Sequence, residues 1–197
     1  QFLAHFSSLL FFKPPEEWGL KAKKNFCRTI ITSIESMRKY RELNKGGELL
    51  VQSMDNLRNS VQDIVVLMMN YIDKEGYKLR KVATMVLCQF ISLNDSVILN
   101  TIMQGYDNIV EDFVFFLDDD AKPNYAYPLI KSLKILCLFG DNNSEYSSSP
   151  NLFLGLIMNL DIEEVLDRCE TKYAESRKLI MLINNFKILL EKLKECQ

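Results

Sequence analysis

Residues 77–105 read YKLRKVATMVLCQFISLNDSVILNTIMQG, and this stretch decides the fold class. Between residues 79 and 90, apolar side chains recur every three or four residues, the spacing that places them on one face of a helix. The Asn-Asp-Ser run at 94–96 interrupts them, and such side chains accept hydrogen bonds from the free N–H groups of a following helix. The stretch predicts a helix over 77–91 and then a short helix that ends at Gly105.

The same spacing recurs along the rest of the chain, whereas the strict alternation of a strand is rare. The fold class is therefore predicted to be all-α. Further helices are expected over 2–12, 15–44, 48–73, 106–117, 127 or 128–139, 151–160 and 161–195. A break near Asn59-Ser60 is an alternative within the third of these, and the last range could hold one helix or a pair. Residues 140–150 predict a surface loop, because they are polar and rich in turn formers.

Composition limits the classes of protein to which the chain can belong. Its 197 residues are 48% hydrophobic, with 7 Gly and 5 Pro, which predicts one folded domain over residues 1–197. Because the chain has 24 basic and 26 acidic residues, no broad positive surface favours binding of nucleic acid. The longest apolar stretches are shorter than the roughly 18 to 20 residues of a membrane span. We therefore expect neither a nucleic acid nor a membrane as partner.

Five cysteines stand at wide spacings that match neither a disulfide framework nor a zinc motif. We interpret them as reduced thiols, which predicts an intracellular location, cytoplasmic or nuclear. Cys27, Cys88 and Cys137 lie in apolar stretches and are expected in the core. Cys169 and Cys196 lie among charged residues and are expected to be exposed.

Nothing in the sequence marks a catalytic site. His5 is the only histidine, and motifs of nucleophilic, nucleotide-binding or zinc enzymes are absent. The run Asp118-Asp119-Asp120 lacks the glycine-containing pattern of a calcium loop, so it is interpreted as a solvated turn. We expect no enzyme activity, no cofactor and no metal.

Polar turns near residues 73–76, 118–123 and 159–161 are spaced close to the about 40 to 47 residues of armadillo and HEAT repeats. Residues 78–160 resemble the armadillo family, because VATMVLCQFI at 82–91 is similar to a third repeat helix and LCLF at 136–139 repeats its register. The resemblance implies a short right-handed α-solenoid of armadillo-like repeats. Residues 73–197 would be repeats and residues 1–72 irregular or degenerate ones. Since no initiator Met is present, we expect a domain of a longer protein.

In armadillo proteins the third helices line a concave groove that holds extended peptides. The resemblance places equivalent groove positions at Thr29 and Ser33, Met85 and Gln89, Lys134 and Leu138, and Met181 and Asn185. The Trp that import-signal binders carry at the first position of each pair is absent here. The predicted partner-binding groove consists of Ser33, Met85, Gln89, Lys134, Leu138 and Asn185.

These observations favour a non-enzymatic scaffold that binds a peptide or helix of a partner protein in the groove. An oligomerisation or assembly domain of a larger structural protein, with a homo-oligomer as its product, is the alternative. A helical bundle with a ligand pocket is a third interpretation.

Overall fold

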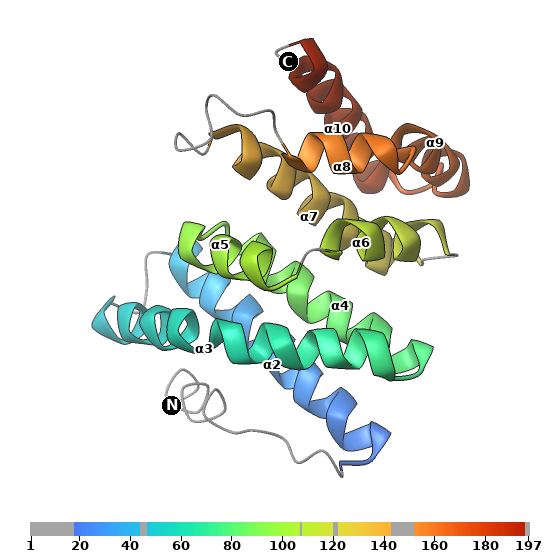
Figure 1. Cartoon of the computed structure of the whole chain (residues 1–197). Helices are drawn as coiled ribbons and strands as arrows, with labels where there is room; N and C mark the ends of the chain where they lie inside the picture. Colours follow the sequence, from blue (N-terminus) through green and yellow to red (C-terminus); the bar gives the residue numbers. More distant parts are fainter. Residues whose placement is uncertain (1–17, 44–46, 107, 120–121, 143–151, 196–197) are drawn as a thin grey trace. The chain divides into compact units, whose positions relative to one another are not determined.

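The computed structural model describes residues 18–43, 47–106, 108–119, 122–142 and 152–195 (Figure 1). Regular structure in these ranges consists of nine α-helices and no strand, so the predicted all-α class is confirmed. The helices are α2 (Leu20–Glu42), α3 (Gly47–Lys74), α4 (Tyr77–Ser92), α5 (Ser96–Gly105), α6 (Ile109–Asp118), α7 (Pro123–Asn142), α8 (Leu152–Asn159), α9 (Ile162–Lys172) and α10 (Arg177–Glu195).

Several sequence predictions lie outside the described residues. They are the helix over 2–12 with His5, the start of the second helix at Pro15, Cys196, and the loop from residue 143 onward. Among the helices that are described, none is both long enough and apolar enough to cross a membrane.

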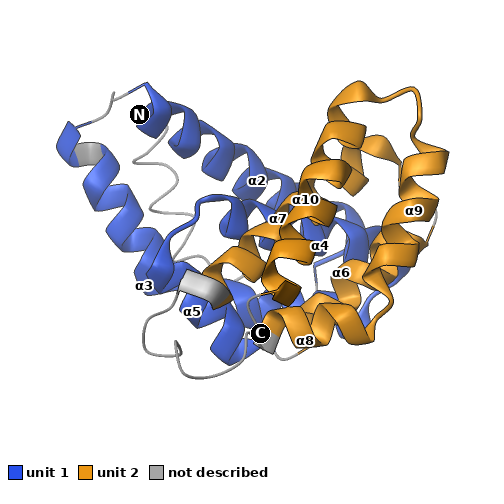
Figure 2. Ribbon diagram, turned by 90° about the horizontal axis from the view of Figure 1, so that it is seen from above, with its two compact units in different colours: residues 1–106 blue, residues 107–197 orange. Residues whose placement is uncertain are grey.

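The chain divides into two compact units (Figure 2). Unit 1 comprises residues 1–106 and contains α2 to α5, and unit 2 comprises residues 107–197 and contains α6 to α10. The subdivision predicted between residues 72 and 73 does not coincide with this boundary, because α3 and α4 on its two sides pack against each other. The single domain and the right-handed solenoid stay predictions.

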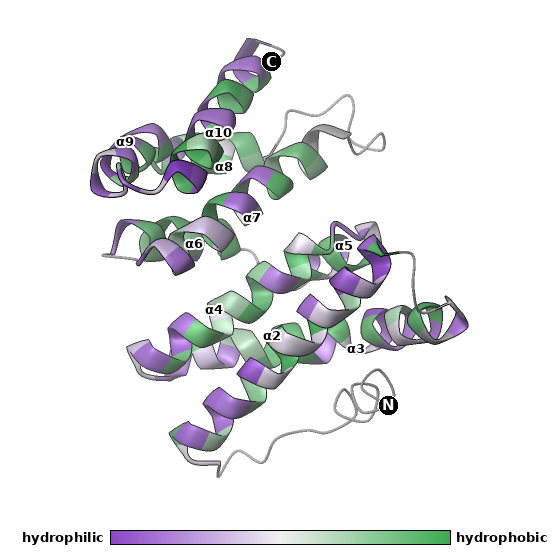
Figure 3. Cartoon of the chain, turned by 180° about the vertical axis from the view of Figure 1, so that it is seen from behind, coloured by the Kyte–Doolittle hydropathy of each residue, from purple (hydrophilic) through white to green (hydrophobic). Residues whose placement is uncertain are grey.

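Helix α4 is the centre of unit 1, where it packs against both α2 and α3. A helix with neighbours on two sides needs apolar residues around most of its circumference. The middle of α4 is accordingly hydrophobic in Figure 3. Ten of its sixteen residues are buried: Leu79, Val82, Ala83, Thr84, Met85, Val86, Leu87, Cys88, Phe90 and Ile91.

Helix α3 runs without the interruption considered at Asn59-Ser60. Ser60 lies on the buried face of the helix with Leu57 and Ile64, and its side chain is only 6% exposed. A serine is small enough to fit this face, so the polar dipeptide leaves the helix intact.

The predicted cap of α5 is confirmed at Asp95. Its Oδ1 accepts a hydrogen bond from the backbone N–H of Ile98, at 3.2 Å. Its Oδ2 also lies 2.7 Å from Nη2 of Arg58, which comes from α3. The cap therefore fixes the start of α5 to the helix against which α5 packs.

Helix α7 is the centre of unit 2 and contacts α6, α8 and α10. It begins at Pro123, so the predicted start at Tyr127 or Pro128 is wrong. A proline fits the first turn of a helix because the N–H that it lacks would have no intrahelical partner there. Pro128 lies inside the helix, where it removes one backbone hydrogen bond without ending it.

The C-terminal range forms the pair of helices that we considered, α9 and α10. Helix α9 packs against α6, α8 and α10, and this contact buries Cys169 to 3% exposure. The predicted exposure of Cys169 is therefore wrong. The charged neighbours that suggested it, Arg168 and Glu170, lie on other sides of the same helix.

Candidate functional site

The candidate groove residues of unit 1 lie where α2 and α4 pack. Ser33 of α2 is 1% exposed and Met85 of α4 is 9% exposed, so other residues of the chain cover both side chains. Gln89 is half-buried, and its Nε2 lies 3.4 Å from Oε1 of Glu35 on α2. These three residues thus contribute to the α2–α4 contact, and their binding role stays a prediction.

The candidate residues of unit 2 are more accessible. Lys134 and Leu138 of α7 are half-buried, and Asn185 of α10 is exposed. Each belongs to a longer stripe, because side chains three or four residues apart share one face of a helix. The stripe on α7 is Tyr127, Lys131, Lys134 and Leu138, and the stripe on α10 is Lys178, Met181, Asn185, Ile188 and Lys192.

One contact places the two stripes next to each other. Helices α7 and α10 pack together, and Nζ of Lys178 lies 4.6 Å from the ring centroid of Tyr127. This is the geometry of a cation–π interaction. The two stripes therefore meet near the starts of the two helices, and we call them together the α7–α10 face.

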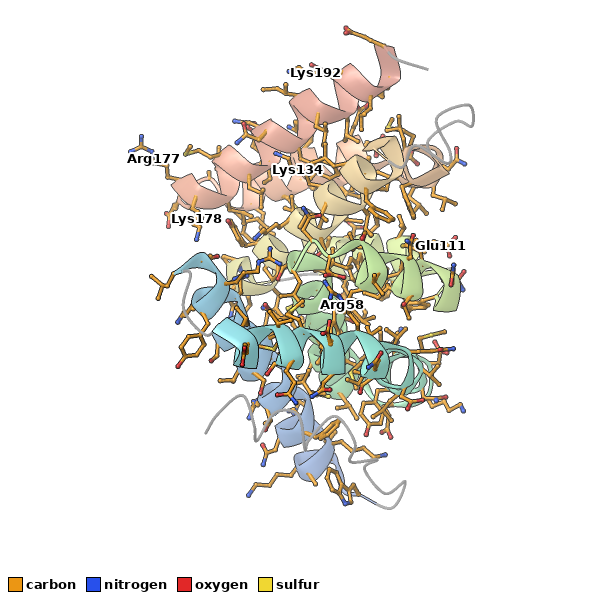
Figure 4. The ribbon with its side chains drawn as sticks, turned by 90° about the vertical axis from the view of Figure 1, so that its left-hand side faces the viewer. Arg58, Glu111, Lys134, Arg177, Lys178 and Lys192 are labelled. Carbon is orange, nitrogen blue, oxygen red and sulfur yellow. The ribbon has the colours of Figure 1, made fainter. Side chains whose placement is uncertain are left out.

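The α7–α10 face is basic. Residues 123–140 and 177–190, which include most of α7 and α10, contain no Asp or Glu. Within the described residues, Lys134, Lys178 and Lys192 form no ion pair. Figure 4 shows how Lys134, Lys178 and Lys192 project from unit 2. These lysines leave positive charge for an incoming group.

The opposite side of α10 has a different arrangement. Nζ of Lys187 lies 2.6 Å from Oδ1 of Asp167 and also bonds Glu170, and Nζ of Lys194 lies 2.7 Å from Oε1 of Glu163. All three acids belong to α9. Burial lowers the pKa of Lys187, but the hydrogen bonds to Asp167 and Glu170 outweigh it and the pKa is raised. This side of α10 is thus neutralised within unit 2.

Two large apolar side chains on the α7–α10 face are about half exposed. Met181 is 56% exposed and Ile188 is 49% exposed, whereas Leu179, Ile183, Phe186, Leu190 and Leu193 of the same helix are buried. They lie two helical turns apart, on either side of Asn185. Larger apolar patches rimmed by polar residues mark protein-binding surfaces, and these two side chains are the exposed apolar part of α10.

Three of the four cysteines in the described residues have a raised pKa. Burial raises the pKa of Cys27 and of Cys137 to about 12 each, and that of Cys169 to about 11. A thiol reacts as a nucleophile in its ionised form, so these three stay inert near neutral pH. Among the described residues, no three His, Cys, Asp or Glu side chains gather as metal ligands would. Of the acidic turn, Asp118 pairs with Arg168 at 2.9 Å.

Comparisons of the chain with protein-family models, curated proteins and solved structures found no match. The resemblance to armadillo proteins consequently stays an expectation based on the residues quoted above.

Sequence reasoning selected Lys134, Leu138 and Asn185 but left Tyr127, Lys178 and Ile188 out of the site. Two signals in the sequence could have found them. One is the spacing of three and four residues from Lys178 to Lys192, and the other is the absence of acids from residues 177–190. The contact between Tyr127 and Lys178 needed the packing of α7 on α10.

Proposed function

We propose that the chain is a non-enzymatic interaction domain that binds a peptide or helix of a partner protein on the α7–α10 face. The observation that carries this proposal is the exposure of Met181 and Ile188 beside lysines without ion pairs. Burial of these two side chains by a partner would remove apolar surface from water, which drives most protein association.

The spacing of the exposed apolar residues on the face suits a helical segment. A helix that lies in a groove presents apolar anchors at positions i, i+3, i+4 and i+7. Met181 and Ile188 are seven residues apart, so they match anchors two turns apart on a bound helix. Lys134, Lys178 and Lys192 would attract carboxylates at the edge of that helix, which raises the association rate and selects acidic partners.

The net charge of the chain and the chemistry of its cysteines favour a protein over other kinds of partner. The chain carries a net charge of -2, whereas nucleic-acid-binding domains are strongly basic. The raised pKa values of Cys27, Cys137 and Cys169 disfavour nucleophilic catalysis by these thiols. The cysteines of the described residues are free, which supports an intracellular location, cytoplasmic or nuclear.

The proposal is tested by affinity capture from an extract of the source cell with wild-type protein, Ile188→Asp and Val66→Asp. Val66 is a matched control, since it is 49% exposed like Ile188 and lies in a helix of unit 1. We expect at least one protein whose recovery falls about tenfold or more with Ile188→Asp, as the loss of one apolar anchor predicts. Its recovery should be unchanged with Val66→Asp. Equal recovery of every protein by all three baits would contradict the proposal.

A further inference from the structure

A second exposed stripe in unit 2 has the opposite charge. On α6, Glu111, Phe115 and Asp118 follow one another at intervals of four and three residues and share one face, with Asp119 beside them. Phe115 is 54% exposed, with its ring edge-on to Phe116 at a centroid distance of 5.7 Å. We call these four residues the acidic α6 stripe.

Two acids of the stripe are available to another molecule. Asp118 is held by Arg168. Glu111 and Asp119 are exposed, and neither forms an ion pair within the described residues. The stripe therefore combines two uncompensated carboxylates with one large apolar side chain between them. The α7–α10 face has the complementary set, lysines beside Met181 and Ile188.

We propose that the acidic α6 stripe of one copy of the chain binds the α7–α10 face of a second copy. The proposal rests on the proposed function, since it names an occupant for the same face. It accounts for both unusual surfaces of unit 2 with one contact, because the apolar side chains and the charges on each surface find counterparts on the other.

The spacing of the charges agrees with this pairing. Glu111 and Asp119 are eight residues apart, which corresponds to about 12 Å along a helix axis. Lys134 lies seven residues, or about 10.5 Å, beyond Tyr127, and Lys178 sits at Tyr127. A copy of α6 laid along the face can thus bring its two acids to Lys134 and Lys178. Phe115, midway between the acids, then lies near Lys131, the stripe residue between Tyr127 and Lys134. Contact of its ring with Met181 of α10 is part of the proposal.

The contact joins different surfaces of the two copies. Figure 4 shows Glu111 at one side of unit 2 and Arg177 and Lys178 at the opposite side, so the two stripes of one molecule do not meet. A contact between two different surfaces repeats head to tail, and it gives rings or open chains rather than a closed twofold dimer. Association should therefore continue beyond two copies as the concentration rises.

The experiment is sedimentation velocity of the chain over about 10 to 500 µM, the range in which small interfaces associate. The samples are wild type, Glu111→Lys, Lys134→Glu and an equimolar mixture of the two variants. Lys39→Glu is the control, since it changes net charge as Lys134→Glu does, at an exposed site in unit 1. Far-UV circular dichroism verifies that each variant is folded.

We expect the wild type and Lys39→Glu to show mass that rises with concentration, less steeply at high salt because ion pairs are screened. Each charge reversal at the contact, Glu111→Lys or Lys134→Glu, should weaken association about three- to tenfold, because it turns an attraction at the rim of the interface into a repulsion. The mixture should recover the association. At one contact Glu111 of the Lys134→Glu variant meets Lys134 of the Glu111→Lys variant, and at the other contact the two substituted side chains, which have opposite charges, meet.

Two results would overturn the inference: a wild-type monomer at all concentrations, or variants that associate as the wild type does. The proposed function is tested by a different result. If the chain is monomeric while a different protein is lost from the Ile188→Asp bait, the face binds that protein and only the second copy is excluded as its occupant.

Discussion

The ammonium group of Lys178 lies 4.6 Å from the centroid of the Tyr127 ring, and this contact links the start of α10 to the start of α7. It aligns the two stripes of the α7–α10 face. Because Tyr127 covers one side of the lysine, the contact also restrains an otherwise mobile cation at the edge of the face.

A double-mutant cycle with Tyr127→Leu and Lys178→Gln measures this contact. We expect a coupling free energy of about 0.5 to 1 kcal/mol in unfolding by urea, the usual range for a cation–π pair at an exposed site. Additive effects of the two substitutions would mean that the pair does not stabilise the packing of α7 on α10.

The cap of α5 should be a sensitive point of unit 1. Asp95→Ala removes the acceptor for the N–H of Ile98 and the partner of Arg58, and should lower the free energy of unfolding by about 0.5 to 2 kcal/mol. Asp95→Asn should cost less, since asparagine also caps helices. Ser96→Ala is the control at an exposed neighbouring position. If Ser96→Ala destabilises the chain as much as Asp95→Ala does in urea titrations, the role of the cap is refuted.

Asp95 also predicts a dependence of stability on pH. Burial raises the pKa of its carboxyl, but hydrogen bonds from Arg58 and from the N–H of Ile98 outweigh burial, so the pKa lies below its ordinary value. A lowered pKa in the folded state stabilises the protein above the unfolded pKa of about 3.9 and loses this effect as pH falls through the folded pKa. The melting temperature of Asp95→Asn should therefore fall less than that of the wild type below about pH 4. Parallel curves would contradict the lowered pKa.

The buried thiols predict that the stability of the protein also depends on pH in the alkaline range. The folded-state pKa values of Cys27 and Cys137 are raised to about 12 by burial, whereas an unfolded cysteine ionises near about pH 8.5. Their contribution to stability is present below the unfolded pKa and is lost as pH rises above it.

Alkylation followed by peptide mapping tests the burial and the raised pKa of these thiols. At about pH 8.5 the native protein should leave Cys27, Cys137 and Cys169 unmodified, and urea should expose all three to iodoacetamide. Rapid modification of Cys137 in the native state would contradict its burial in unit 2.

The sequence was informative wherever one helix decided the outcome. Residues 77–105 predicted α4, α5 and a cap within Asn94-Asp95-Ser96, because periodicity and capping are local properties. The sequence alone does not give the exposure of a side chain where two helices decide it together. Met85 fits a groove position by register, yet α4 has neighbours on two sides and the residue is buried.

The predicted start of α7 and the predicted exposure of Cys169 were wrong for two different reasons. Pro123 and Pro128 are both compatible with a helix start, and the sequence alone does not choose between them. Cys169 has charged neighbours along the chain, but α9 directs it into the core of unit 2. Periodicity identifies the faces of a helix, and packing determines which of these faces meet.

The most direct test of binding at the α7–α10 face is photo-crosslinking in the source cell with p-benzoylphenylalanine in place of Ile188 or of Val66. Both side chains are 49% exposed on helices, so the two probes differ in the surface that they report. We predict a specific crosslinked protein with the probe at Ile188 and none with the probe at Val66. Equal crosslinking at the two positions, or none at Ile188, would contradict binding at this face.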